Sequence, residues 1–77
     1  MLGKINAGES GGANLRQTPN GKYIMTLIND TVVEIQPEKR NVNGVEWIRI
    51  QTVIEGQRLE GWLLASVIEY SNVTPSP

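Results

Sequence analysis

Apolar and polar residues alternate along short segments of this chain, and turn-forming residues separate the segments. In residues 44–52, Ile48 and Ile50 alternate with polar neighbours, as in a half-buried strand. A second apolar segment, residues 59–64, follows the Gly-containing turn at residues 55–57. These two segments predict a hairpin. Because two strands alone are only marginally stable in water, further strands must complete the core.

Three more short segments meet the same criteria and are predicted as strands: residues 13–16, 23–28 and 31–36. Residues 65–70 are too short for a stable helix and are expected to form a turn that leads into a last short strand. Asn20-Gly21, Asn29-Asp30 and Asn43-Gly44 supply turns between them. Pro37 is expected to end the strand over residues 31–36, so that residues 38–41 form a charged loop. Residues 65–67 predict a single 3₁₀ turn.

Five or six short strands at intervals of 8–12 residues, with no helical stripe, predict an all-β fold closed into a small barrel or sandwich. The inward face of the strand over residues 23–28 is ambiguous, because either Tyr23, Met25 and Leu27 or Ile24 and Ile28 could point to the core, and a bulge could mix these two sets. We favour Ile24 and Leu27 as the buried residues. The predicted core consists of Leu15, Ile24, Leu27, Val33, Ile35, Ile48, Ile50, Leu63 and Ile68.

The two ends of the chain differ in composition from its middle. Residues 1–12 contain four glycines and no periodicity, which predicts a flexible linker. Residues 71–77 are rich in Ser, Thr and Pro and predict a second linker. We therefore expect one domain over residues 13–70, a module of a longer protein that is monomeric in isolation.

Composition narrows the possible chemistry. The 77 residues include no Cys, so the chain has no thiolate ligand for a metal. They also include no His, which is the commonest metal ligand and the commonest general base. The carboxylates are scattered over different strands, so we expect no catalytic residues, no metal site and no cofactor. A net charge of −1 without a basic run argues against nucleic acid as a partner. The apolar runs are too short for insertion into a membrane.

Trp47 is the strongest candidate for a binding residue. If Ile48 and Ile50 face the core, Trp47 lies on the opposite face of its strand and is at least partly exposed. Alternatively, the indole covers an end of the barrel or packs against the loop that carries Thr18 and Pro19. Both interpretations remain open, because large aromatic residues are common in cores and in binding sites. Trp62 is expected on the outer face in a structural role.

Five landmarks in order make this chain resemble the bacterial SH3 domain (Src-homology 3-like). They are Ala13-Asn14-Leu15-Arg16 followed by Pro19, Ile24 with Leu27, Thr31-Val32-Val33-Glu34-Ile35, Trp47-Ile48-Arg49-Ile50, and Gly61-Trp62-Leu63. The resemblance covers residues 13–70. Two segments depart from the family pattern, Gln17-Thr18 before the proline and Asn29-Asp30 in the following turn.

The resemblance implies an SH3-like barrel of five or six antiparallel strands with a non-catalytic binding or targeting function. Members of the family are often attached to cell-wall hydrolases or to envelope and secreted proteins, and some bind peptidoglycan peptides. The cell envelope or the exterior is therefore favoured by the resemblance alone. The alternative is a structural or intramolecular interaction domain that packs against a neighbouring domain of its own chain.

By the same resemblance, Trp47 matches the tryptophan that lines the ligand groove of eukaryotic relatives. A polyproline ligand needs several aromatic residues side by side, and here only Trp47 is available. We expect instead a shallow site for a short peptide or a peptidoglycan fragment, formed by Arg16, Pro19, Glu46, Trp47 and Leu64.

Overall fold

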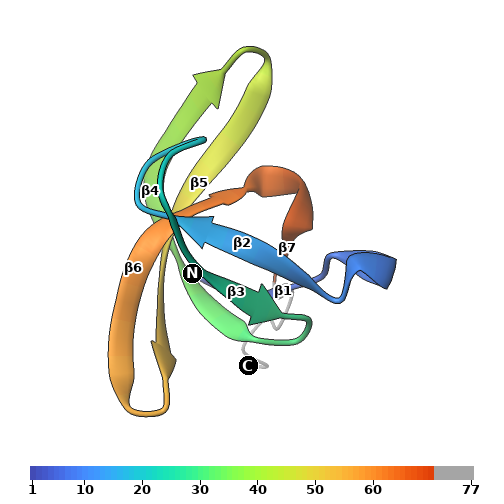
Figure 1. Ribbon diagram of the computed structural model, residues 1–77, viewed down its shortest axis with the longest axis vertical. Coiled ribbons are helices and arrows are strands. Elements are labelled where there is room, and N and C mark those ends of the chain that lie inside the picture. The colour runs from blue at the N-terminus through green and yellow to red at the C-terminus, as the bar shows by residue number, and fades with distance from the viewer. Residues whose placement is uncertain (71–77) are drawn as a thin grey trace, which may run out of the picture.

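The computed structural model describes residues 1–70, which form seven strands and two 3₁₀ helices (Figure 1). The strands are β1 (Leu2–Ile5), β2 (Gly12–Arg16), β3 (Tyr23–Ile28), β4 (Val32–Val42), β5 (Val45–Ile54), β6 (Gln57–Leu64) and β7 (Ile68–Tyr70), and the helices are η1 (Gly8–Ser10) and η2 (Ala65–Val67). The all-β prediction is confirmed, and so are the 3₁₀ turn at residues 65–67 and the short strand after it. The number of strands is seven, not five or six.

All seven strands belong to one antiparallel sheet with the order β3-β2-β6-β5-β4-β1-β7. The sheet curls strongly, so that β2 and β3 cross in front of the long β4–β5 and β5–β6 hairpins (Figure 1). This curl gives a barrel-like half-shell with a single core.

The N-terminal segment is part of this sheet, so the prediction of a flexible linker over residues 1–12 was wrong. β1 pairs with both β4 and β7, and Ile5 is completely buried. The Asn29 side chain accepts a hydrogen bond from the Ala7 N–H (2.8 Å) and donates one to the Gly8 carbonyl (2.9 Å). The strand was not predicted because it spans only four residues, too few for a clear alternation, in a segment rich in glycine. The predicted linker over residues 71–77 lies outside the described residues.

The two longest hairpins have turns that the sequence predicted. Asn43 and Gly44 have φ angles of 53° and 81°, and Glu55 and Gly56 have φ angles of 51° and 78°. Positive φ at both central residues is the type I′ arrangement, whose twist matches that of paired strands. These turns fix the register of β5 against both neighbours.

β4 does not end where the sequence predicted. It runs through Pro37 to Val42, so residues 38–41 are strand and not a loop. The pairing with β5 is irregular between Ile35 and Lys39, which places the proline at a bulge. Proline is tolerated there because a bulge leaves one residue without a partner in the ladder.

The core agrees closely with the prediction. Seven of the nine predicted residues are buried, and Ile24 and Ile35 are half-buried against them. The register of β2 against β3 shifts between Leu15 and Arg16, which mixes the two faces of β3 as expected. Ile5 and Ala13 complete the cluster and were not predicted.

Gly61 allows β2 to lie close against β6. A Cβ atom at this position would lie 2.6 Å from the Arg16 carbonyl oxygen and 2.9 Å from Leu15 Cδ1. Both neighbours are constrained, one as backbone and the other as a fully buried side chain. The absence of a side chain at Gly61 therefore positions Arg16.

Gly61→Ala is expected to lower the free energy of unfolding by about 1–3 kcal/mol, because the added methyl group overpacks this crossing. Denaturation in urea would measure the loss. Arg58→Ala, at an exposed position of the same strand, is the control and should change stability by less than about 0.5 kcal/mol. Equal midpoints for Gly61→Ala and wild type would contradict the close approach of β2 and β6.

Candidate functional site

A groove of about 610 Å³ lies on the described surface, and we call it the Trp47 groove. Its volume lies within the range typical of ligand sites. The apolar lining residues are Ala7, Ala13, Trp47, Leu64 and Val67, and the remaining ones are Ser10, Gly12, Asn14, Arg16, Asn20 and Thr26. The groove thus combines residues from the N-terminal segment, β2, β3, β5, β6 and η2.

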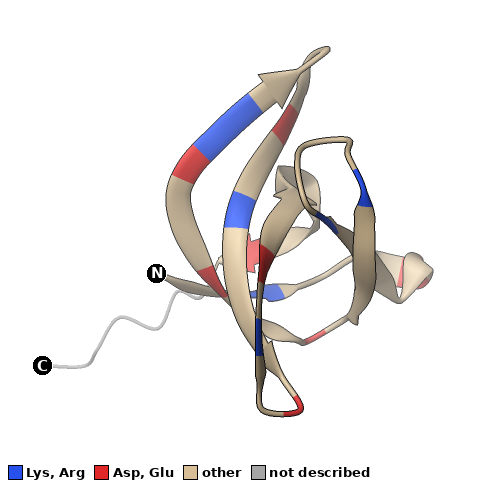
Figure 2. Ribbon diagram, turned by 60° about the vertical axis from the view of Figure 1, so that its left-hand side comes forward, with Lys and Arg blue, Asp and Glu red and all other residues tan. Residues whose placement is uncertain are grey.

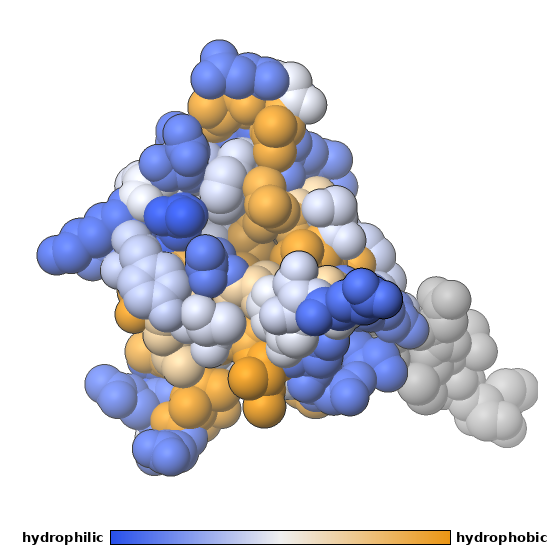
Figure 3. Space-filling model, turned by 45° about the vertical axis from the view of Figure 1, so that its right-hand side comes forward, coloured by the Kyte–Doolittle hydropathy of each residue, from blue (hydrophilic) through white to orange (hydrophobic). Residues whose placement is uncertain are grey.

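A second hollow of about 210 Å³ adjoins the Trp47 groove. The two share Asn20, Trp47 and Leu64, and the second extends to Val42 and Val45 at the tip of the β4–β5 hairpin. Figure 3 shows apolar surface descending from this tip between hydrophilic groups. The two hollows therefore adjoin one another along Asn20, Trp47 and Leu64.

The loop over residues 17–22, which borders the groove, is held by a set of hydrogen bonds. The Gly21 N–H donates to the Thr18 carbonyl (2.8 Å), which closes a turn with Pro19 and Asn20 at its centre. Asn20 adopts a φ of 57°, which asparagine tolerates better than most residues. Arg16 Nη1 donates to the Gly21 carbonyl (2.9 Å) and ties the loop to β2.

Trp47 is buried, with 6% of its surface exposed, so the prediction that its indole faces water was wrong. Ile48 and Ile50 face the core as predicted, and Trp47 lies on the other face of β5. That face is covered as well, because only a small part of the indole is exposed. Asn20, Leu64 and Val67 line the same hollows as the indole, and β5 contacts η2. The burial of the indole favours a structural role for Trp47 over that of an exposed binding residue.

The predicted site residues are only partly brought together. Arg16, Trp47 and Leu64 line the Trp47 groove. Pro19 is half-buried within the bordering turn and does not line it. Glu46 is exposed, pairs with Asn41, and lies on the opposite face of β5 from Trp47.

Several groove residues were not predicted. Ala7 and Ser10 belong to the segment expected to be a linker, and only the tertiary fold brings them to the groove. Asn14 and Thr26 face each other across β2 and β3, and the Thr26 hydroxyl donates to Asn14 Oδ1 (3.1 Å). The polar alternation within these two strands was a signal that could have identified them.

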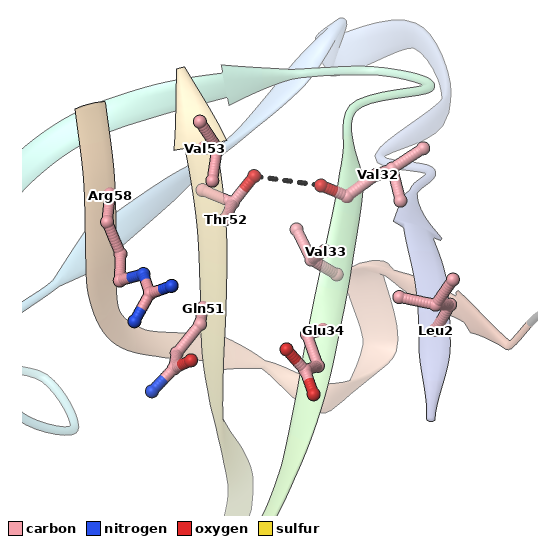
Figure 4. A pocket seen from close by; sticks show the side chains of 8 residues that line it. All are labelled: Leu2, Val32, Val33, Glu34, Gln51, Thr52, Val53 and Arg58. Carbon is pink, nitrogen blue, oxygen red and sulfur yellow. Dashed lines mark hydrogen bonds between the residues drawn. The ribbon is translucent and has the colours of Figure 1, made fainter. Parts of the chain in front are cut away.

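A separate hollow of about 310 Å³ lies on the outer face of β1, β4 and β5 (Figure 4). Leu2, Val32 and Val53 line it and are 56%, 60% and 62% exposed, and we call these three residues the outer-face patch. Beneath them, the buried Thr52 hydroxyl donates to the Val32 carbonyl (2.8 Å) and joins β5 to the start of β4. Exposed aliphatic side chains that cluster in this way are typical of contact surfaces.

Charges on the rest of the surface are mixed in sign. Figure 2 shows acidic and basic positions interspersed along β4 and β5. Arg49 pairs with Glu38 (3.7 Å) and Glu60, and the Arg40 guanidinium lies 5.8 Å from the ring centre of Trp62. Trp62 therefore packs against a charged side chain at the surface, which is in keeping with a structural role.

Two further searches concern residues 1–70 only. In this part of the chain, no group of three or more His, Cys, Asp or Glu side chains is arranged to hold a metal ion. No helix there is long and apolar enough to cross a membrane.

The fold and the groove define the class of this protein as a small all-β domain with a curled antiparallel sheet and a partly polar surface groove. Comparisons of the chain with protein-family models, with curated proteins and with solved structures gave no match.

Proposed function

We propose that this chain is an SH3-like domain of the bacterial type and that it acts as a non-catalytic binding or targeting module. The five sequence landmarks lie on consecutive strands of one curled sheet, from β2 to β6, which supports the SH3-like assignment. The short 3₁₀ helix between the last two strands is in keeping with it. The ligand we propose is a short peptide, with the peptide part of peptidoglycan as the first candidate.

The observation that carries this proposal is the composition of the Trp47 groove. Amide and hydroxyl groups from Asn14, Asn20 and Thr26 lie beside an apolar floor of Trp47 and Leu64. Such a surface matches a peptide, whose backbone forms hydrogen bonds while its side chains seek apolar contacts. Among the described residues, no carboxylate lines this groove, which favours binding over acid–base catalysis.

An NMR titration with a peptidoglycan stem peptide tests the proposal. We expect progressive shifts at the backbone amides of Asn14, Asn20, Leu64 and Val67, because these residues border the groove. The amides of the outer-face patch serve as the internal control and should not move. A flat response at the groove amides up to millimolar peptide would argue against the proposal.

The second candidate is an interaction domain that packs against a neighbouring domain, and the outer-face patch favours it. When a partner removes three largely exposed aliphatic side chains from water, the complex is stabilised by about 25 cal/mol per Å² of apolar surface buried. Under this function the isolated domain would not respond to stem peptides. The same titration therefore separates the two candidates.

A further inference from the structure

We infer that the Trp47 groove binds a short peptide through its free C-terminus. The Arg16 guanidinium would donate hydrogen bonds to the negatively charged C-terminal carboxylate. This inference rests on the proposed function, because it names the chemistry of the peptide at the same site. It follows from the charge, the donors and the apolar floor of the groove.

The first argument concerns charge. Arg16 is the single charged side chain among the residues that line the groove. The nearest acidic positions along the chain, Glu9 and Glu46, adjoin lining residues but do not line the groove themselves. Although the whole chain has a net charge of −1, this groove has a positive lining. A positive site with polar walls favours an anionic group over a cationic or neutral one.

The second argument concerns the donors of Arg16. A guanidinium has five N–H donors in a planar fork, which matches the geometry of a carboxylate. In this structure one donor group, Nη1, is bonded to the Gly21 carbonyl. That bond holds the half-buried side chain in place and reduces the conformational entropy lost when a ligand binds. Arg16 is thus positioned in advance, and the other donors of its fork are not needed for the loop contact.

The third argument concerns what lies beside the guanidinium. Asn14, on the same strand, and Asn20, in the loop, offer amide groups to a peptide backbone. The half-buried side chains of Leu64 and Val67, with the small exposed part of Trp47, provide an apolar surface for one side chain of the ligand. A carboxylate next to one peptide unit and one apolar side chain is the chemistry of a peptide C-terminus.

The test compares two forms of one peptide on the unmodified domain. N-acetyl-alanyl-leucyl-alanine is titrated as the free acid and as the C-terminal amide, with the groove amides observed by NMR. We expect the acid to bind about two- to fivefold more tightly, the gain expected from one charge pair at a half-exposed site. The advantage should shrink between about 50 and 500 mM salt because of screening.

Variants at Arg16 assign the effect to that residue. Arg16→Gln should abolish the preference, so that acid and amide bind with equal affinity, whatever the lost bond to the Gly21 carbonyl does to the affinity for both. Arg16→Lys, which keeps the charge but loses the fork, should retain part of the preference. A proton–nitrogen spectrum of each variant checks that the loop over residues 17–22 is unchanged.

The possible outcomes separate the inference from the proposed function. Equal affinities for acid and amide, both at the groove amides, would overturn the inference and leave the binding function standing. A preference for the acid that persists in Arg16→Gln would also overturn it. If neither tripeptide nor a stem peptide shifted the groove amides, the proposed function would fail and the inference with it.

Discussion

Trp47→Ala is expected to lower the free energy of unfolding by about 3–5 kcal/mol, the usual cost of truncating a large buried aromatic side chain. Trp47 is 6% exposed and lines the groove together with Asn20 of the loop over residues 17–22, Leu64 and Val67. Truncation would remove the packing around this buried indole and leave a cavity beside the groove. Because the same indole forms the floor of the groove, peptide binding should be lost together with stability.

Urea denaturation and a proton–nitrogen NMR spectrum would measure this effect. Trp62→Ala is the matched control, because Trp62 is only half-buried and stacks against Arg40 at the surface. Its loss should be clearly smaller. If the two tryptophan variants were equally stable, the burial of Trp47 would be wrong.

Ile50→Ala is expected to unfold the domain or bring it close to unfolding. Ile50 is completely buried at the centre of the sheet, where β5 pairs with β4 and β6. Truncation of such a residue costs about 2–5 kcal/mol. A domain of this size has about 4–12 kcal/mol of stability in total. A single cavity can therefore remove most of it.

Thermal unfolding followed by circular dichroism would show this result as a large drop in Tm or the loss of the transition. Val53→Ala is the control on the same strand, since Val53 is 62% exposed and its truncation leaves no cavity. We expect its effect to stay within about 0.5 kcal/mol. A cooperative transition of Ile50→Ala at the wild-type temperature would contradict the assignment of Ile50 to the core.

Local alternation predicted the buried and exposed faces of the strands except where a bulge shifts the pairing. Period-2 alternation correctly placed Val33, Ile48 and Ile50 inside and Val32 outside. It was ambiguous in β3, where a register shift against β2 changes which side chains face inward. It also ended β4 too early, because the sequence does not reveal that Pro37 lies at an irregularity in the pairing.

The sequence predicted only those groove residues that lie on segments with a clear local pattern. Arg16, Trp47 and Leu64 were predicted as site residues and do line one groove. Their neighbours Ala7 and Ser10 come from the N-terminal segment, which has no periodic signal long enough to predict. Pro19 and Glu46 were included because of their positions in the sequence, and neither lines the groove.

The sequence by itself determined six of the seven strands, the positive-φ turns and most of the core, because alternation and turn chemistry act between residues close together in the chain. The tertiary structure decided that β1 joins the sheet, that Trp47 is buried although it lies on the face of β5 opposite Ile48, and that a groove with one guanidinium in its lining forms beside it. Each of these features depends on contacts between segments far apart in the chain. The pattern of one strand can say which face is apolar, but only packing decides what covers the other face.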